Sequence, residues 1–146
     1  MSFIFQSQPI RYDLRKVLKP GARVAWVASR YRDFMKPGEI VYLWLAGESK
    51  VRGIYGWAEI TSKHPQPDAN GIFRVEITYR RNFLSHECGN HLTIDEIRSN
   101  NVLASMLILR VPVGTNFLLS DEENVEICQL IREKYGEDWL PPTRKS

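Results

Sequence analysis

Apolar residues in the first part of the chain follow patterns that predict three consecutive strands. Residues 23–28 (RVAWVA) alternate in a strand-like way and include Trp26, and residues 39–46 (EIVYLWLA) are apolar at nearly every position. A short run that is apolar throughout is typical of a strand buried on both faces of a sheet. Residues 51–62 follow a polar turn and are predicted to pair with that strand. Gly53 and Gly56 within them indicate a bulge or the close approach of another backbone.

Outside this block, hydrophobic periodicity predicts further strands and several short helices. Residues 72–82 (IFRVEITYRRN) alternate most clearly and predict a half-exposed strand. Thr93 stands three residues before Glu96, and Ser120 three before Glu123, which is the spacing of a helix capping box. The other expected elements are strands over 3–6 and 104–111, helices over 13–18 (capped by Asp13), 93–99 and 120–135 (ended by Gly136), and a helical turn over 29–35. Together they predict an α+β protein built on a curved, five- or six-stranded β-barrel flanked by short helices.

The composition fits one folded domain. The chain has 146 residues, of which 43% are hydrophobic, enough for a packed core. We expect a single domain over residues 1–138 and a flexible C-terminal tail over 139–146. The net charge of +3 permits nucleic-acid binding without requiring it, so the positions of the arginines carry more information than their number.

Targeting signals and cysteine usage predict a cytoplasmic protein. No run of about 18 apolar residues is present, so no membrane span is expected. The N-terminus lacks a basic leader followed by a long apolar stretch, so secretion is not expected. Cys88 and Cys128 have no CxxC spacing and are interpreted as reduced thiols.

A search for catalytic motifs predicts that the protein is not an enzyme and needs no cofactor. The chain has no nucleophile elbow, phosphate-binding loop or dinucleotide fingerprint. Glu59, two residues after Trp57, is one candidate for a buried acid, although an edge charge on a half-exposed strand is the favoured interpretation. His86, Cys88 and His91 are a metal-site alternative to a polar loop, but paired-knuckle spacing and a second half-site are absent. We therefore expect no metal.

Aromatic rings and arginines are concentrated in the block of three predicted strands. Trp26, Trp44 and Trp57 lie there together with three tyrosines, interleaved with four arginines. Such a mixture suits a pocket for a flat, neutral ring beside phosphates. Some of these rings must also fill the core, and Tyr42 and Trp57 are the ones expected there.

Four segments in order give the chain a resemblance to a known family. They are FIFQSQPIRYDL, VAWVASRYRDFMKPGEIVYLWLAGE, GIYGWAEITSKHPQP and VPVGTNFLLSDEE. Together they resemble an EVE domain of the PUA-like superfamily, a relative of YTH and ASCH domains, and most closely the EVE modules of modification-dependent restriction systems. The resemblance implies a small barrel with an aromatic cage that receives a flipped, modified base. In restriction systems such modules are linked to modified cytosine in DNA.

The resemblance also assigns roles to individual residues. It implies a cage tryptophan at Trp26, a pocket rim at Arg30 and Tyr31, and either a pocket wall or core position at Trp44. The polar turn Gln6, Ser7 and Gln8 would read the edge of the base through hydrogen bonds. The third cage wall is assigned to Tyr79, because Ile77 stands where YTH readers carry a tryptophan. The candidates for contact with the nucleic-acid backbone are Arg11, Arg32, Arg80, Arg81 and Arg110.

These observations leave three functional hypotheses. The first is a reader that binds a modified base, such as 5-methylcytosine or 5-hydroxymethylcytosine, flipped from DNA. It would act with a nuclease or NTPase effector subunit or domain and would have no membrane partner. The second is an RNA-binding module that recognises a modified or unpaired base. The third is a hydrolase or glycosylase that acts on the flipped base, which would require a carboxylate in the pocket, with Glu59 as the candidate.

Overall fold

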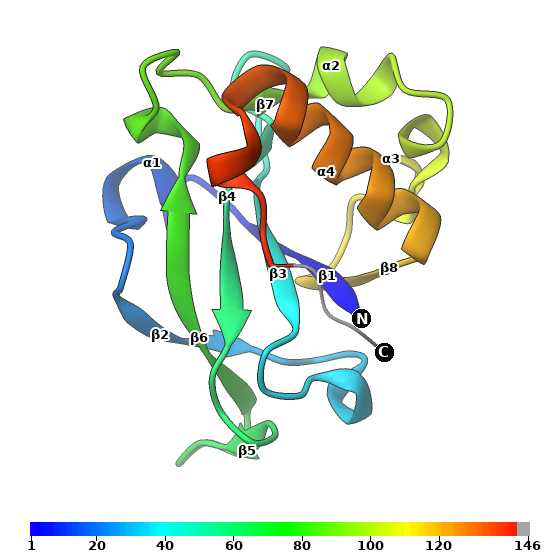
Figure 1. Cartoon of the computed structure of the whole chain (residues 1–146). Helices are drawn as coiled ribbons and strands as arrows, with labels where there is room; N and C mark the ends of the chain where they lie inside the picture. Colours follow the sequence, from blue (N-terminus) through cyan, green and yellow to red (C-terminus); the bar gives the residue numbers. More distant parts are fainter. Residues whose placement is uncertain (143–146) are drawn as a thin grey trace.

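A mixed sheet curled into a half-barrel forms the centre of the protein. In the computed structural model, which describes residues 1–142, the strands follow the order β2-β6-β4-β3-β1-β8, with β5 added beside β6 and β7 beside β4 (Figure 1). The pair β1–β3 is parallel and the other pairs are antiparallel. The strands are β1 (Ser2–Ser7), β2 (Arg23–Val27), β3 (Ile40–Leu45), β4 (Gly53–Ile60), β5 (Gln66–Pro67), β6 (Phe73–Asn82), β7 (Leu92–Thr93) and β8 (Asn116–Leu119). The predicted α+β fold with a curved, barrel-like sheet and short helices is confirmed.

Both faces of the sheet are covered, which explains the uninterrupted apolar run of β3. All six residues of β3 are buried, as the sequence predicted. Val41 and Leu43 point into an inner core inside the curl of the sheet, while Tyr42 and Trp44 point into an outer core. Side chains of β1, the parallel neighbour of β3, alternate between the two cores in the same way, and Phe5 faces the inner core. The outer core also contains Trp57, so Tyr42 and Trp57 are core residues, as expected.

Helices near the C-terminal end of the chain cover the outer core. These are α2 (Ile94–Arg98), α3 (Leu107–Arg110) and α4 (Asp121–Tyr135), which gather on one side of the sheet in Figure 1. Thr93 and Ser120 cap α2 and α4 in complete capping boxes with Glu96 and Glu123, so both predicted helix starts are confirmed. Gly136 ends α4, also as predicted.

One short helix closes an end of the inner core. Helix α1 (Leu14–Val17) begins after Asp13, whose carboxylate accepts a hydrogen bond from the Arg15 amide at 3.1 Å, as predicted for an N-cap. Leu14 and Leu18 bury their side chains among the inner-core residues. The remaining helical pieces are single 3₁₀ turns: η1 (Arg32–Phe34), η2 (Phe83–Ser85), η3 (Leu103–Ser105) and η4 (Glu137–Trp139).

The strand predicted over residues 104–111 is wrong. This segment forms the end of η3 and then α3; Met106, just before α3, and Ile108 within it are buried against the outer core. A short apolar run does not distinguish a strand from a buried helical segment, and Ala, Leu and Met favour helix. The strand lies further on, where β8 pairs antiparallel with β1.

Two glycines allow strands to approach closely, as the sequence indicated. The ladder between β3 and β4 shifts register after Leu43, and the ladder between β4 and β6 shifts after Trp57. A Cβ added to Gly56 would lie 2.0 Å from the Arg81 carbonyl oxygen, and one added to Gly53 would lie 2.1 Å from the carbonyl oxygen of Leu92. Both positions therefore require glycine.

The chain remains packed beyond residue 138. Trp139 and Leu140 contact the outer core, and the Trp57 indole donates a hydrogen bond to the Trp139 carbonyl oxygen at 2.8 Å. Trp139 and Leu140, at the start of the expected tail, therefore pack on the domain, while residues 143–146 of that tail lie outside the described residues. Within residues 1–142, no helix has both the length and the apolar composition needed to cross a bilayer.

Candidate functional site

A cavity of about 530 Å³ opens where the curl of the sheet is incomplete, between β2 and the end of β1. Its volume lies within the range of small-ligand pockets, roughly 300–1,000 Å³. The residues that line it come from four segments distant in sequence: Gln6, Ser7, Gln8, Arg11, Tyr12, Val24, Ala25, Trp26, Val27, Arg74 and Thr115. Among the expected base-binding residues, the structure brings together Trp26, Gln6, Ser7 and Gln8.

The side chain of Asn116 connects the two edge strands beside this cavity. The strands β2 and β8 end the sheet order and are not paired with each other. Asn116, in β8, accepts hydrogen bonds at Oδ1 from the Ser29 amide (2.8 Å) and hydroxyl (3.2 Å). Its Nδ2 donates to the Val27 carbonyl oxygen at 3.0 Å. The buried side-chain amide of Asn116 therefore links β8 to the end of β2. The space between these two edge strands beside Asn116 is the cavity.

Two aromatic rings form a corner of the cavity. The rings of Trp26 and Tyr12 are nearly perpendicular, at 89°, with centroids 5.6 Å apart. The Phe5 ring supports Trp26 from the inner core at 5.9 Å. The hydroxyl groups of Tyr12 and Tyr79 are 2.6 Å apart and share a hydrogen bond, and burial raises the pKa of the Tyr79 phenol above its usual range. Tyr79 therefore stays protonated and fixes the orientation of Tyr12.

Polar groups line the side of the cavity formed by the end of β1. The Gln6 amide nitrogen donates to the carbonyl oxygens of Gly114 (2.7 Å) and Pro112 (3.4 Å), which holds the segment before β8 against β1. Ser7 is buried, and its hydroxyl has no hydrogen-bond partner among the described residues. A buried hydroxyl without a partner costs about 1–3 kcal/mol, which makes Ser7 a candidate for contact with a ligand of the cavity.

The charged groups at the cavity are cationic. Arg74 donates a hydrogen bond to Asp68 at 2.9 Å, and this contact holds the pKa of the Asp68 carboxyl below its usual range. The second cation, Arg11, is exposed. The described residues that line the cavity include no carboxylate, histidine or cysteine. The site can therefore bind an anionic ligand with an aromatic part, and it offers no side-chain general base of those types.

Several residues assigned to the pocket by resemblance lie elsewhere, and these assignments are corrected. Trp44 is buried in the outer core on the opposite face of the sheet, because its neighbours in β3 take the inner face. Tyr79 lies behind Tyr12 and does not line the cavity. Arg30 and Tyr31 follow β2 outside the cavity lining; Arg30 is exposed, and Tyr31 packs partly on the inner core.

Of the five arginines assigned to the nucleic-acid backbone, Arg11 lies at the cavity. The others are spread over different faces. Arg32 stacks on the Phe73 ring at 3.9 Å, and Arg80 pairs with Glu59 at 3.8 Å. Arg81 donates to the Asp138 carbonyl oxygen at 2.7 Å, and Arg110 donates to that of Ser105 at 3.1 Å. Glu59 lies in the interior strand β4, where it is partly exposed, and it does not line the cavity; the expectation of an edge charge is therefore wrong as to its place in the sheet.

Sequence reasoning missed Tyr12 and Arg74 as cavity residues. Tyr12 belongs to the quoted opening segment FIFQSQPIRYDL, so its proximity to Gln8 was a usable signal. Arg74 reaches the cavity because β6 pairs with β2 in a register that places it opposite Val27. That register is a long-range feature, and no local pattern specifies it.

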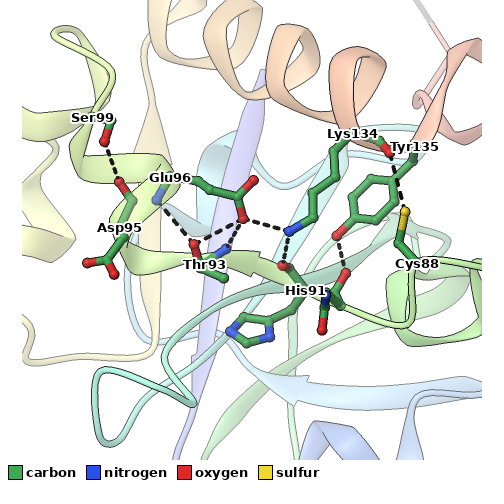
Figure 2. Close-up of polar contacts among 9 residues, drawn as sticks. Cys88, His91, Thr93, Asp95, Glu96, Ser99, Lys134 and Tyr135 are labelled. Carbon is green, nitrogen blue, oxygen red and sulfur yellow. Dashed lines mark hydrogen bonds and ion pairs between the residues drawn. The ribbon is translucent and has the colours of Figure 1, made fainter.

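The loop with the sequence HECGNH is held by structural contacts. Figure 2 shows Lys134 of α4 donating to the Glu96 carboxylate (2.6 Å) and to the His91 carbonyl oxygen (2.8 Å). The His86 ring packs edge-on against Tyr135. Across the described residues, no group of three or more histidine, cysteine or acidic side chains is arranged to hold a metal ion. These contacts favour the polar-loop interpretation of the segment.

The His91 side chain predicts a pH dependence of stability. Its ring stacks on Tyr55 at 4.3 Å, and burial lowers its pKa below the usual 6.5, with Lys134 and Arg15 acting in the same direction and an Arg52 backbone contact and Glu96 opposing them. Because the unfolded chain binds this proton more readily, the free energy of unfolding should fall as the pH decreases below about 6.5. Urea unfolding at pH 7.5 and 5.5 tests this. His91→Phe should reduce the difference between the two pH values, whereas His64→Phe, at an exposed histidine, should not.

Comparison with known proteins identifies the fold. No protein-family model and no curated protein sequence matches the chain. The protein Rpa0253 from Rhodopseudomonas palustris matches with a TM-score of 0.69 at 20% identity, covering 88% of this chain and 91% of that one. A protein from Leishmania major matches with a TM-score of 0.67 at 17% identity, covering 91% and 95%. Human THYN1, in a crystal structure with DNA containing 5-methylcytosine, matches with a TM-score of 0.65 at 17% identity, covering 88% and 96%. These similarities, all at 20% identity or below, show a shared fold.

Proposed function

We propose that the protein is a non-enzymatic reader that binds a modified cytosine, such as 5-methylcytosine or 5-hydroxymethylcytosine, flipped from DNA into the cavity beside Trp26. The observation that carries the proposal is the perpendicular corner of Trp26 and Tyr12 next to the unpartnered Ser7 hydroxyl. The shared fold with human THYN1, whose structure contains 5-methylcytosine DNA, supports the same ligand class. Within the PUA-like superfamily, the EVE domains are the proposed family.

The geometry suits a flat base with a small substituent. A base stacked on the Trp26 ring gains about 1–3 kcal/mol, which offsets much of the cost of removing it from a duplex. An added methyl group that contacts the perpendicular Tyr12 ring adds about 0.8 kcal/mol. Gln6 and Ser7 both line the cavity, and their side chains are the proposed hydrogen-bond partners of the amino and carbonyl groups of the base edge.

The remaining features are consistent with binding and with downstream action by another protein. Arg11 supplies positive charge at the cavity for the flanking phosphates, whereas the charge of Arg74 is compensated by its ion pair with Asp68. A nuclease or NTPase effector, encoded separately or on the same chain, is the proposed partner, with the cytoplasm as the place of action. The cavity lining described above supports binding over hydrolysis or base release because it lacks a carboxylate.

Binding assays with oligonucleotides that differ only at one cytosine test this proposal. Fluorescence anisotropy should show about three- to tenfold tighter binding of 5-methylcytosine or 5-hydroxymethylcytosine DNA than of unmodified DNA, because the gain comes from one or two buried groups. Equal affinity for modified and plain DNA would contradict the proposal. Tighter binding of the matched RNA would favour the RNA-binding hypothesis instead.

A further inference from the structure

Two of the most exposed apolar side chains stand on segments that border the cavity. Ile10 is 93% exposed and Val113 is 73% exposed, the two largest values among the large hydrophobic residues described. Ile10 lies between Gln8 and Arg11, which both line the cavity. Val113 lies two residues before Thr115, which also lines it. Isolated exposed apolar residues are common, so the informative point is that these two occur beside the same opening.

Hydrogen bonds hold the backbone of the two segments that carry Ile10 and Val113. The carbonyl oxygen of Gln8 accepts from the amides of Arg11 (3.0 Å) and Tyr12 (2.8 Å), which forms a tight turn with Ile10 at its tip. The carbonyl oxygens on both sides of Val113, those of Pro112 and Gly114, accept from the Gln6 amide nitrogen.

The two segments also lie on the same rim of the opening. The backbone N–H of Gln6 donates a hydrogen bond to the Thr115 carbonyl oxygen at 2.8 Å, which keeps the segment before β8 next to the end of β1. This rim lies across the cavity from the β2 residues Val24–Val27. Ile10 and Val113 are exposed beside the opening of the cavity and pack on no other described residue to an extent that buries them. A ligand bound at the cavity would therefore supply the apolar contact that these two side chains lack.

We infer that Ile10 and Val113 are wedges that enter the base stack of a DNA duplex next to the flipped nucleotide, so that the ligand of the cavity is double-stranded DNA. This inference rests on the proposed function. A base that leaves a duplex leaves a gap between its neighbours, and proteins that open base steps commonly insert apolar side chains there. A single strand has no stack to hold open and gains much less from such residues. The wedges therefore specify the form of the nucleic acid, while the Trp26 corner specifies the base.

The double variant Ile10→Ala/Val113→Ala tests the inference. We expect it to bind a duplex with one central 5-methylcytosine about ten- to a hundredfold more weakly than the native chain, and to bind the matched single strand within about twofold of the native affinity. Val125→Ala, which truncates another exposed valine (63%) on α4, is the matched control and should change neither affinity. The substitutions are at exposed positions, so folding should be preserved, which circular dichroism can verify.

The outcomes separate this inference from the proposed function. A double variant that bound the duplex as tightly as the native chain would overturn the wedge role, as would an equal loss on the single strand. A native chain that preferred the modified base in single strands but did not bind the duplex would overturn the inference, and of the proposed function it would leave standing the recognition of the modified cytosine but not its flipping from a duplex. Absence of any preference for the modified base in either form would contradict both.

Discussion

Trp26→Ala should remove the preference for modified over plain cytosine and weaken binding of both DNAs by about ten- to a hundredfold, because stacking on an aromatic ring contributes about 1–3 kcal/mol per base. Trp26 supplies the larger face of the aromatic corner, and no other tryptophan lines the cavity within the described residues. Fluorescence anisotropy with matched 5-methylcytosine and cytosine oligonucleotides measures both effects. A variant that discriminated as well as the native chain would show that the corner is not the base-binding surface.

The control for Trp26→Ala must separate lost binding from lost stability. Trp57→Ala removes a side chain of the same size from the outer core, where Trp57 is similarly buried. Each substitution should lower the free energy of unfolding by about 3–5 kcal/mol. At a temperature where both variants remain folded, the Trp57 variant should still discriminate between the two DNAs. Tyr12→Leu, at a half-buried ring, provides a second test with a smaller expected cost in stability.

The parts of the fold that depend on local chemistry were predictable from the sequence. Both capping boxes and the N-cap at Asp13 follow from residue types at fixed spacing, and the structure confirms them. The burial of β3 on both faces followed from its apolar run. Residues 104–111 were assigned to the wrong element because helix and strand bury a short apolar segment equally well.

The composition of the cavity was harder to predict because it depends on which face of a doubly buried sheet each residue occupies. Trp44 lies in β3, which is buried on both faces, and it faces the outer core, whereas Trp26 lies in the edge strand β2 and faces the inner core. In a strand with two apolar faces, the alternation that normally distinguishes them is absent. Tyr12 and Arg74 reach the cavity through long-range contacts, with Tyr79 and β2 respectively, that no single segment encodes.

Asn116→Leu should cause the largest loss of stability among polar substitutions near the site. The change keeps the approximate size of the side chain but leaves the Ser29 amide and the Val27 carbonyl oxygen without their partner. Because each unsatisfied buried group costs about 1–3 kcal/mol, we expect the free energy of unfolding to fall by about 2–4 kcal/mol in urea titrations. Asn116→Asp keeps the acceptor and loses the donor to Val27, so its loss should depend on that one bond and on the added charge. Unchanged stability in Asn116→Leu would show that the edges β2 and β8 are held together by other contacts.

The same substitution should also impair the cavity, because Asn116 is the point where β2 is tied to the strand beside β1. Without that tie, the wall that carries Trp26 is no longer fixed relative to Gln6 and Ser7 on the opposite wall. We therefore expect Asn116→Leu to lose discrimination between modified and plain cytosine even under conditions where circular dichroism shows it to be folded. Asn124→Leu is the matched control, since it breaks a hydrogen bond with the Tyr42 hydroxyl (2.6 Å) in the outer core, far from the cavity lining. Asn124→Leu should lower the free energy of unfolding but still discriminate between modified and plain cytosine. If both variants lost this discrimination, general destabilisation would explain the effect of Asn116→Leu.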